Sequence, residues 1–96
     1  NFLLRSKQYK EIISLFNSEM KIIESHSSLL NILGEAYVNL ENFDEGIKYF
    51  LSGYDKNNMN SEVSLNLGKT YKIIGNDKES QKFINKSKEI MKNRNE

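Results

Sequence analysis

The sequence predicts an all-α fold, a right-handed solenoid of antiparallel helix pairs. The first observation is a repeat with a period of 34 residues, in which a Leu-Gly pair followed by a tyrosine occurs twice, as Leu33, Gly34, Tyr37 and as Leu67, Gly68, Tyr71. The second is that apolar residues between these motifs lie at helical intervals. The third is that the same helix-start signal occurs twice at this period. A fixed period of this length is typical of stacked helical units, each of which packs on its neighbours.

Composition supports stacked pairs over one central core. The 96 residues suffice for one small domain, and only 38% of them are hydrophobic. The absence of cysteine excludes disulfides and thiolate metal sites and is typical of a reducing compartment. No apolar run approaches the roughly 18 residues that a membrane crossing requires. We therefore expect an intracellular, cytoplasmic protein without a membrane partner. Because the chain begins inside a repeat, we expect it to be a fragment of a longer one.

Apolar spacing and start signals predict the first three helices. An apolar stripe predicts a helix near 8–18, preceded by the end of an earlier helix around Phe2, Leu3 and Leu4. A second stripe predicts a helix near 28–40. Asn42 is a favoured N-cap, and Glu45 follows at the spacing of a capping box, so a third helix is expected over 43–55.

The same signals return in the second half of the chain. Asn60 or Ser61 caps a helix expected over 61–74, and Gly75 is well placed as the left-handed residue that ends it. Asn76 and Glu79 repeat the capping box and predict a last helix near 77–92.

Small residues inside the helices indicate close helix packing. Glycine in a helix interior costs about 1 kcal/mol relative to alanine. That cost is tolerated where a neighbouring backbone must approach closely, so we expect Gly34 and Gly68 to face another helix. The second helices carry small residues at matching positions, namely Gly46, Gly53, Ser80 and Ser87.

These residues give the chain a specific resemblance to the tetratricopeptide repeat, a 34-residue antiparallel helix pair. Leu33-Gly34-x-x-Tyr37 and its second copy match the first helix of that family, and small, aromatic and small residues at Gly46, Phe50 and Gly53 match its second helix. The resemblance implies units at 27–60 and 61–94. Residues 1–26 resemble part of an earlier unit, the tail of its first helix and its second helix.

First helices of this family line a concave groove that holds a partner. By resemblance, the groove-facing residues are Asn31, Glu35, Val38, Asn39, Leu65, Asn66, Lys69 and Lys72, with Ile73 as a further candidate. We expect the polar ones on one continuous concave surface to be solvent-accessible, namely Asn31, Glu35, Asn66, Lys69 and Lys72. One branch of the family clamps terminal carboxylates, and Asn66 matches the central asparagine of that clamp. A carboxylate at Glu35 would repel an anionic tail, so we expect a peptide of mixed polarity.

Other functions have weaker support. The lone His26 lacks companion ligands, no Gly-x-Ser-x-Gly elbow or glycine-rich phosphate loop is present, and we expect neither an enzyme nor a cofactor or metal. Most aromatic residues lie on the apolar stripes, although Tyr49 is expected to be exposed. Residues 69–96 carry 8 basic and 4 acidic side chains, against 6 and 9 in residues 1–68. We interpret that basic end as a solvated helix face, and we expect no nucleic-acid partner.

The sequence therefore predicts a module that binds a protein or peptide. The alternative is a structural role, in which the chain forms one stretch of a longer solenoid and associates with itself. Because a severed unit cannot bury its apolar face, we expect Phe2, Leu3, Leu4 and the stripe around Ile13 to be exposed. Self-association through the truncated N-terminal end, or marginal stability, is the expected result.

Overall fold

A computed structural model describes residues 2–94 of the chain, and the side chains of residues 2–4 lie outside the described part. Within these residues all regular structure is helical, as the sequence predicts. The six helices are α1 (Phe2–Ser18), α2 (Met20–Ile23), α3 (Ser27–Asn39), α4 (Phe43–Lys56), α5 (Ser61–Ile73) and α6 (Asp77–Arg94).

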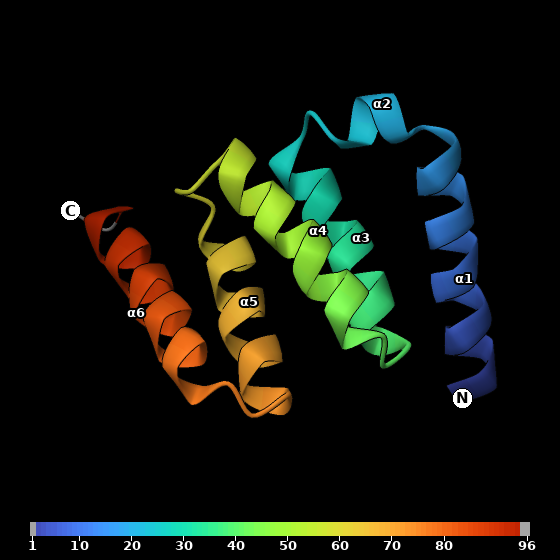
Figure 1. The fold of residues 1–96 in the computed structure, drawn as a ribbon. Coiled ribbons are helices and arrows are strands. Elements are labelled where there is room, and N and C mark those ends of the chain that lie inside the picture. Colours follow the sequence, from blue (N-terminus) through green and yellow to red (C-terminus); the bar gives the residue numbers. More distant parts are fainter. Residues whose placement is uncertain (1, 95–96) are drawn as a thin grey trace.

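The helices form a row of adjacent antiparallel pairs (Figure 1). α3 pairs with α4 and α5 pairs with α6, while α4 and α3 both contact α5. α1 packs on α3, and the short α2 connects the two. The two chain ends lie at opposite sides of the row, which measures 39 × 30 × 21 Å. This is the arrangement of a helical solenoid, in which each unit contacts its neighbours in sequence.

The N-terminal helix differs from the sequence prediction. α1 runs without a break from Phe2, whereas we expected a separate earlier helix to end before residue 8. In each complete unit a residue of positive φ ends the first helix, Glu41 at 63° and Gly75 at 85°. Lys7 occupies the equivalent position and lies inside α1, so the chain does not turn there. The expected exposure of Phe2, Leu3 and Leu4 concerns side chains outside the described part.

The helix starts follow the predicted signals in part. The Asn60 side chain accepts hydrogen bonds from the backbone N–H groups of Glu62 (3.1 Å) and Val63 (3.4 Å). Asn76 accepts one from Glu79, at 3.3 Å. Asn42 makes no such bond, so the capping box predicted there is wrong.

The glutamates of both predicted boxes have other partners. Glu45 pairs with Lys48 (3.9 Å), and Glu79 pairs with Lys82 (3.8 Å), each one turn further along its helix. These carboxylates therefore point along the helix surface, and neither is seen to bond back to the asparagine N–H that a complete box requires.

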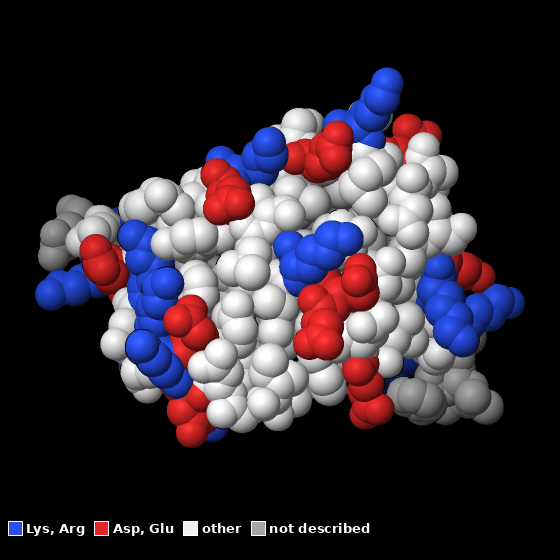
Figure 2. All heavy atoms as spheres, viewed as in Figure 1, with Lys and Arg blue, Asp and Glu red and all other residues white. Residues whose placement is uncertain are grey.

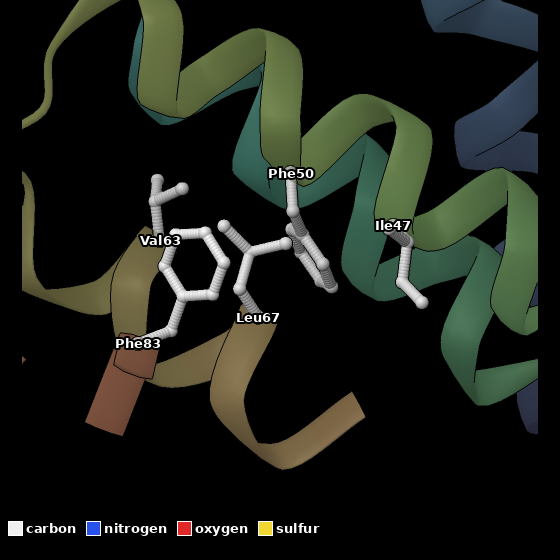
Figure 3. Close-up of a cluster of buried hydrophobic side chains, with 5 residues drawn as sticks. All are labelled: Ile47, Phe50, Val63, Leu67 and Phe83. Carbon is white, nitrogen blue, oxygen red and sulfur yellow. The ribbon is translucent and has the colours of Figure 1, made fainter. Parts of the chain in front are cut away.

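The main core joins the two complete units. Leu67 of α5 is fully buried and lies between the ring of Phe50 from α4 and the ring of Phe83 from α6 (Figure 3). Ile47 and Val63 complete this cluster. A second cluster of Ile23, Leu30 and Leu33 holds α2 and α3 together and is covered by Ile13 and Phe16 of α1. Two neighbouring clusters agree with the modest apolar content of the chain.

The small residues hold the paired helices at close range, as predicted. A Cβ atom on Gly34 would lie 2.6 Å from the Phe50 ring, and one on Gly68 would lie 2.6 Å from Cγ1 of Ile84. Serines take the place of glycine in the second pair. Ser80 donates to the Gly68 carbonyl at 2.7 Å, and Ser87 donates to the Ser61 carbonyl at 3.1 Å.

Replacing Gly68 with leucine tests this contact. We expect Gly68→Leu to cost at least about 1–3 kcal/mol, because the new side chain must displace Ile84 and the α6 backbone. In a domain of this size, each kcal/mol lost lowers the melting temperature by about 4–8 °C. Lys72→Leu, which adds the same side chain at an exposed position of α5, is the control. Equal melting temperatures for the two variants would contradict close packing of α5 on α6.

Ser64 provides a second test, with the opposite sign. Its hydroxyl is fully buried and has no hydrogen-bond partner, at the position where the preceding unit has Leu30. An unsatisfied buried hydroxyl costs about 1–3 kcal/mol. We therefore expect Ser64→Ala to stabilise the fold by about 1 kcal/mol. Ser80→Ala should destabilise it, because that buried hydroxyl is bonded. Thermal melting showing the same sign for both would refute this account.

Candidate groove between α3 and α5

A polar bridge joins the first helices of the two units. The Asn66 side-chain amide of α5 donates to Oδ1 of Asn31 at 2.9 Å and to Oε1 of Glu35 at 2.8 Å, both on α3. Three predicted groove residues thus meet directly. The expectation that Asn31 is solvent-accessible is wrong, since it is only 4% exposed. It is buried because α5 packs against α3 at this point.

A hollow of about 250 Å³ lies beside this bridge. Its lining is Glu35, Val38, Asn39, Phe50, Asn66, Lys69, Thr70 and Ile73. Val38 and Ile73 provide apolar surface on α3 and α5, and the Phe50 ring of α4 lies behind them. Ile73 is 58% exposed, which is high for an isoleucine. The hollow therefore combines an apolar interior with a polar rim, as binding sites commonly do.

Sequence reasoning identified most of this lining. Five of the eight predicted groove residues line the hollow, and so does the further candidate Ile73. Leu65 is half-buried and Lys72 is exposed, and neither borders it. Phe50 and Thr70 were missed. Phe50 reads as core in the sequence, and it is indeed buried at 1% exposed, although its side chain borders the hollow.

Hydrogen bonds already occupy most polar donors around the hollow. Both amide hydrogens of Asn66 are used in the bridge. Thr70 donates its hydroxyl to the Asn66 carbonyl at 2.7 Å, and Asn39 donates its side-chain amide to the Glu35 carbonyl, also at 2.7 Å. The ammonium group of Lys69 makes no ion pair with Glu35 or with any other carboxylate of residues 2–94.

The aromatic side chains pack on one another. Tyr37 and Tyr49 stack with ring centroids 5.5 Å apart, and Tyr71 and Phe83 stack at 5.9 Å in the next unit. Tyr49 is therefore half-buried, contrary to the expected exposure. Burial raises the pKa of Tyr49 and of Tyr71 above the ordinary 10.0, so both stay uncharged at neutral pH. These rings serve the fold.

The basic C-terminal helix shares its surface with carboxylates. Figure 2 shows blue side chains in a column over α6 with red ones beside them. Lys82 pairs with Glu79, and its ammonium also lies 5.2 Å from the centre of the Phe83 ring. Such contacts within one helix are those of a solvated surface, where an exposed pair contributes little.

Other kinds of site receive no support from the described residues. Residues 2–94 contain no group of three histidine, cysteine or carboxylate side chains that could hold a metal ion. His26 Nδ1 lies 2.9 Å from the Ile22 carbonyl and 3.1 Å from the Ser25 hydroxyl, which are local contacts at a helix start. Over the same part of the chain, every helix is too short or too polar to cross a membrane.

The sequence profile of the tetratricopeptide repeat family matches residues 27–54 and 61–93. The chain belongs to the tetratricopeptide repeat family. The two matched segments begin at the first residues of α3 and α5, so each helix pair corresponds to one matched segment. The groove between α3 and α5 is thus formed by the first helices of two successive tetratricopeptide repeats.

Two curated proteins are similar to this tetratricopeptide repeat chain. Protein O-mannosyl-transferase TMTC3 of Homo sapiens is 29% identical over 87 residues, and the protein of the same name from Mus musculus is 28% identical over 89 residues. These alignments cover 91% and 93% of this chain but 10% of each relative. The chain spans about a tenth of the length of these relatives, so the likeness concerns only a small part of each.

Proposed function

We propose that this chain is a protein-interaction module and that the hollow between α3 and α5 binds a peptide segment of a partner protein. The exposed Ile73 carries the proposal, because this large apolar side chain lines the same hollow as the buried Phe50 and as Glu35 and Lys69, whose charges make no ion pair within residues 2–94. Apolar surface next to a polar rim favours a bound peptide, since burial supplies affinity and the charges supply specificity.

The hydrogen bonds beneath the hollow favour binding without rearrangement. The Asn66 amide fixes both Asn31 and the Glu35 carboxylate before any partner arrives. Side chains held in place lose little conformational freedom on binding, so less of the interaction energy is spent on ordering them. The close glycine contacts between α3 and α4 hold the helix on which Glu35 and Val38 lie.

Two adjacent isoleucines provide a matched test of this groove. The immobilised chain is used to select binders from a random peptide display library, and their affinities are measured by fluorescence anisotropy. We expect Ile73→Asp to weaken binding at least about tenfold, or 1.4 kcal/mol, because it places a charge in the apolar part of the hollow. Ile74→Asp changes a neighbour that is 44% exposed but does not line the hollow, and it should bind as the parent does.

Circular dichroism verifies that both variants fold. If Ile73→Asp and Ile74→Asp bind the selected peptides equally well, or if no peptide is selected, the groove is not the binding site.

A second function, self-association, has its own observation at the other end of the row. Leu15 of α1 is 62% exposed and borders a hollow of about 400 Å³ with Gln8, Glu11 and Ile12. Tyr49, the equivalent of Leu15 in the next unit, stacks on Tyr37 of its own first helix. We propose that a second copy of the chain covers this apolar face of α1, in agreement with the structural role expected from the sequence.

Changing Leu15 to glutamate tests that association. Sedimentation velocity of the parent at rising concentration should give a growing dimer fraction, and Leu15→Glu should abolish it, since burying an unpaired carboxylate is strongly unfavourable. Met91→Glu, on an exposed position of α6 at the far end, should leave the dimer unchanged. A parent chain that stays monomeric at every concentration would rule out this interface.

Catalysis is not proposed for this chain, and a cytoplasmic location stays a prediction. Transferase activity is named for the two relatives, and this chain matches only a tenth of each, so the activity is not carried over.

A further inference from the structure

The arrangement of charges around the groove specifies what kind of peptide it accepts, provided that the groove function proposed above holds. The Glu35 carboxylate has one oxygen, Oε1, fixed by the Asn66 amide at 2.8 Å. Its other oxygen has no partner among residues 2–94. Because this acceptor is already oriented, a positively charged donor from a partner would bind it as a charge-assisted hydrogen bond.

The remaining polar groups do not offer equivalent donors to an anion on this side. The Asn66 amide hydrogens both point to α3, and the Asn39 side-chain amide donates to its own helix. An acidic group placed beside Glu35 would therefore meet a like charge, with one neutral amide hydrogen of Asn39 left to bond it. The one unpaired cation of the lining is Lys69, on α5.

Glu35 and Lys69 occupy the same position in successive units and belong to helices in direct contact. Packed helices have axes about 8–10 Å apart. An extended peptide rises about 3.3 Å per residue, so about three residues span the distance between the two helices. Val38 and Ile73 lie in the same hollow, available to the residues between the charges.

We propose that the hollow selects a dipolar segment of a partner protein, with an arginine or lysine and an aspartate or glutamate about three residues apart and apolar residues between them. The basic side chain binds the free oxygen of Glu35, and the acidic one binds Lys69. The intervening residues pack on Val38 and Ile73. Glu35 and Lys69 are thus the specificity-determining residues of the groove. Glu35 repels the acidic peptides that Lys69 alone would accept, and Lys69 repels the basic peptides that Glu35 alone would accept.

Synthetic peptide pools test this polarity directly. Four pools of short fluorescent peptides share a central pair of positions drawn from leucine, isoleucine and valine. The flanking pair is basic and acidic in either order, both basic, both acidic, or glutamine and asparagine. Anisotropy titrations should give the parent chain an affinity for the mixed pool at least about tenfold higher than for any other pool.

Charge reversal should move that preference in a defined way. Glu35→Lys should favour the acidic pool, Lys69→Glu should favour the basic pool, and the double variant should return to the mixed pool. Lys72→Glu, on an exposed residue of α5 outside the hollow, should keep the parental preference. Circular dichroism melting establishes that each variant folds, because Glu35→Lys also removes the bond from Asn66.

Two failures are distinguishable. If peptides selected from the random library depend on Ile73 but the parent binds the four pools alike, or binds none of them, the dipolar inference is wrong and the groove remains the binding site. If the pools bind and Ile73→Asp has no effect on them, the groove itself is wrong. Tightest binding of the acidic pool by the parent would also overturn the inference.

Discussion

The fold depends on close backbone contact between the two helices of each pair. In the first unit a Cβ atom on Gly46 would lie 3.0 Å from the Gly34 carbonyl, so only glycine fits without a shift. The second unit replaces one glycine with Ser80, whose hydroxyl bonds the Gly68 carbonyl at 2.7 Å. The approach is similar in both units, since a Cβ atom would lie 3.0 Å from the Gly46 carbonyl if placed on Gly34 and 3.1 Å from the Ser80 carbonyl if placed on Gly68. Because interiors are close-packed, this spacing fixes where every larger side chain can lie.

The contact between units follows from that spacing. With α5 held tightly on α6, Leu67 fills the space between the Phe50 and Phe83 rings and carries the core from one unit to the next. The same approach brings Asn66 within reach of α3, where it makes both of its amide bonds. Apolar packing on one side of α5 and a satisfied polar bridge on the other hold two units in one relative position. The bridge uses both of its amide hydrogens, whereas the buried hydroxyl of Ser64 is left without a partner.

Periodicity made the fold predictable, whereas contacts between units were only partly visible in the sequence. Helix positions, the buried Phe50 and the left-handed Gly75 all follow from local spacing and residue type. The burial of Asn31 does not follow from local spacing. Spacing shows on which face of a helix a residue lies, but it does not show how close the next helix comes to that face. The continuous α1 was also missed. Its apolar pattern matched that of a second helix, but nothing in the local pattern indicated that Lys7 would stay helical where Glu41 and Gly75 turn.

In the proposed groove, the amide of Asn66 would link stability to recognition, since this one group both joins the units and orients Glu35. The equivalent residue of the preceding unit is Ile32, which is exposed and cannot form such a bridge. Ile32 lies one turn before Glu35 on the same side of α3, so the surface changes along the helix from apolar to charged. The polar bridge therefore joins α3 and α5 and is not a feature that every repeat unit shares. A partner that follows the proposed groove would meet a sequence of chemically different positions, and this asymmetry would give a repetitive scaffold a single binding register.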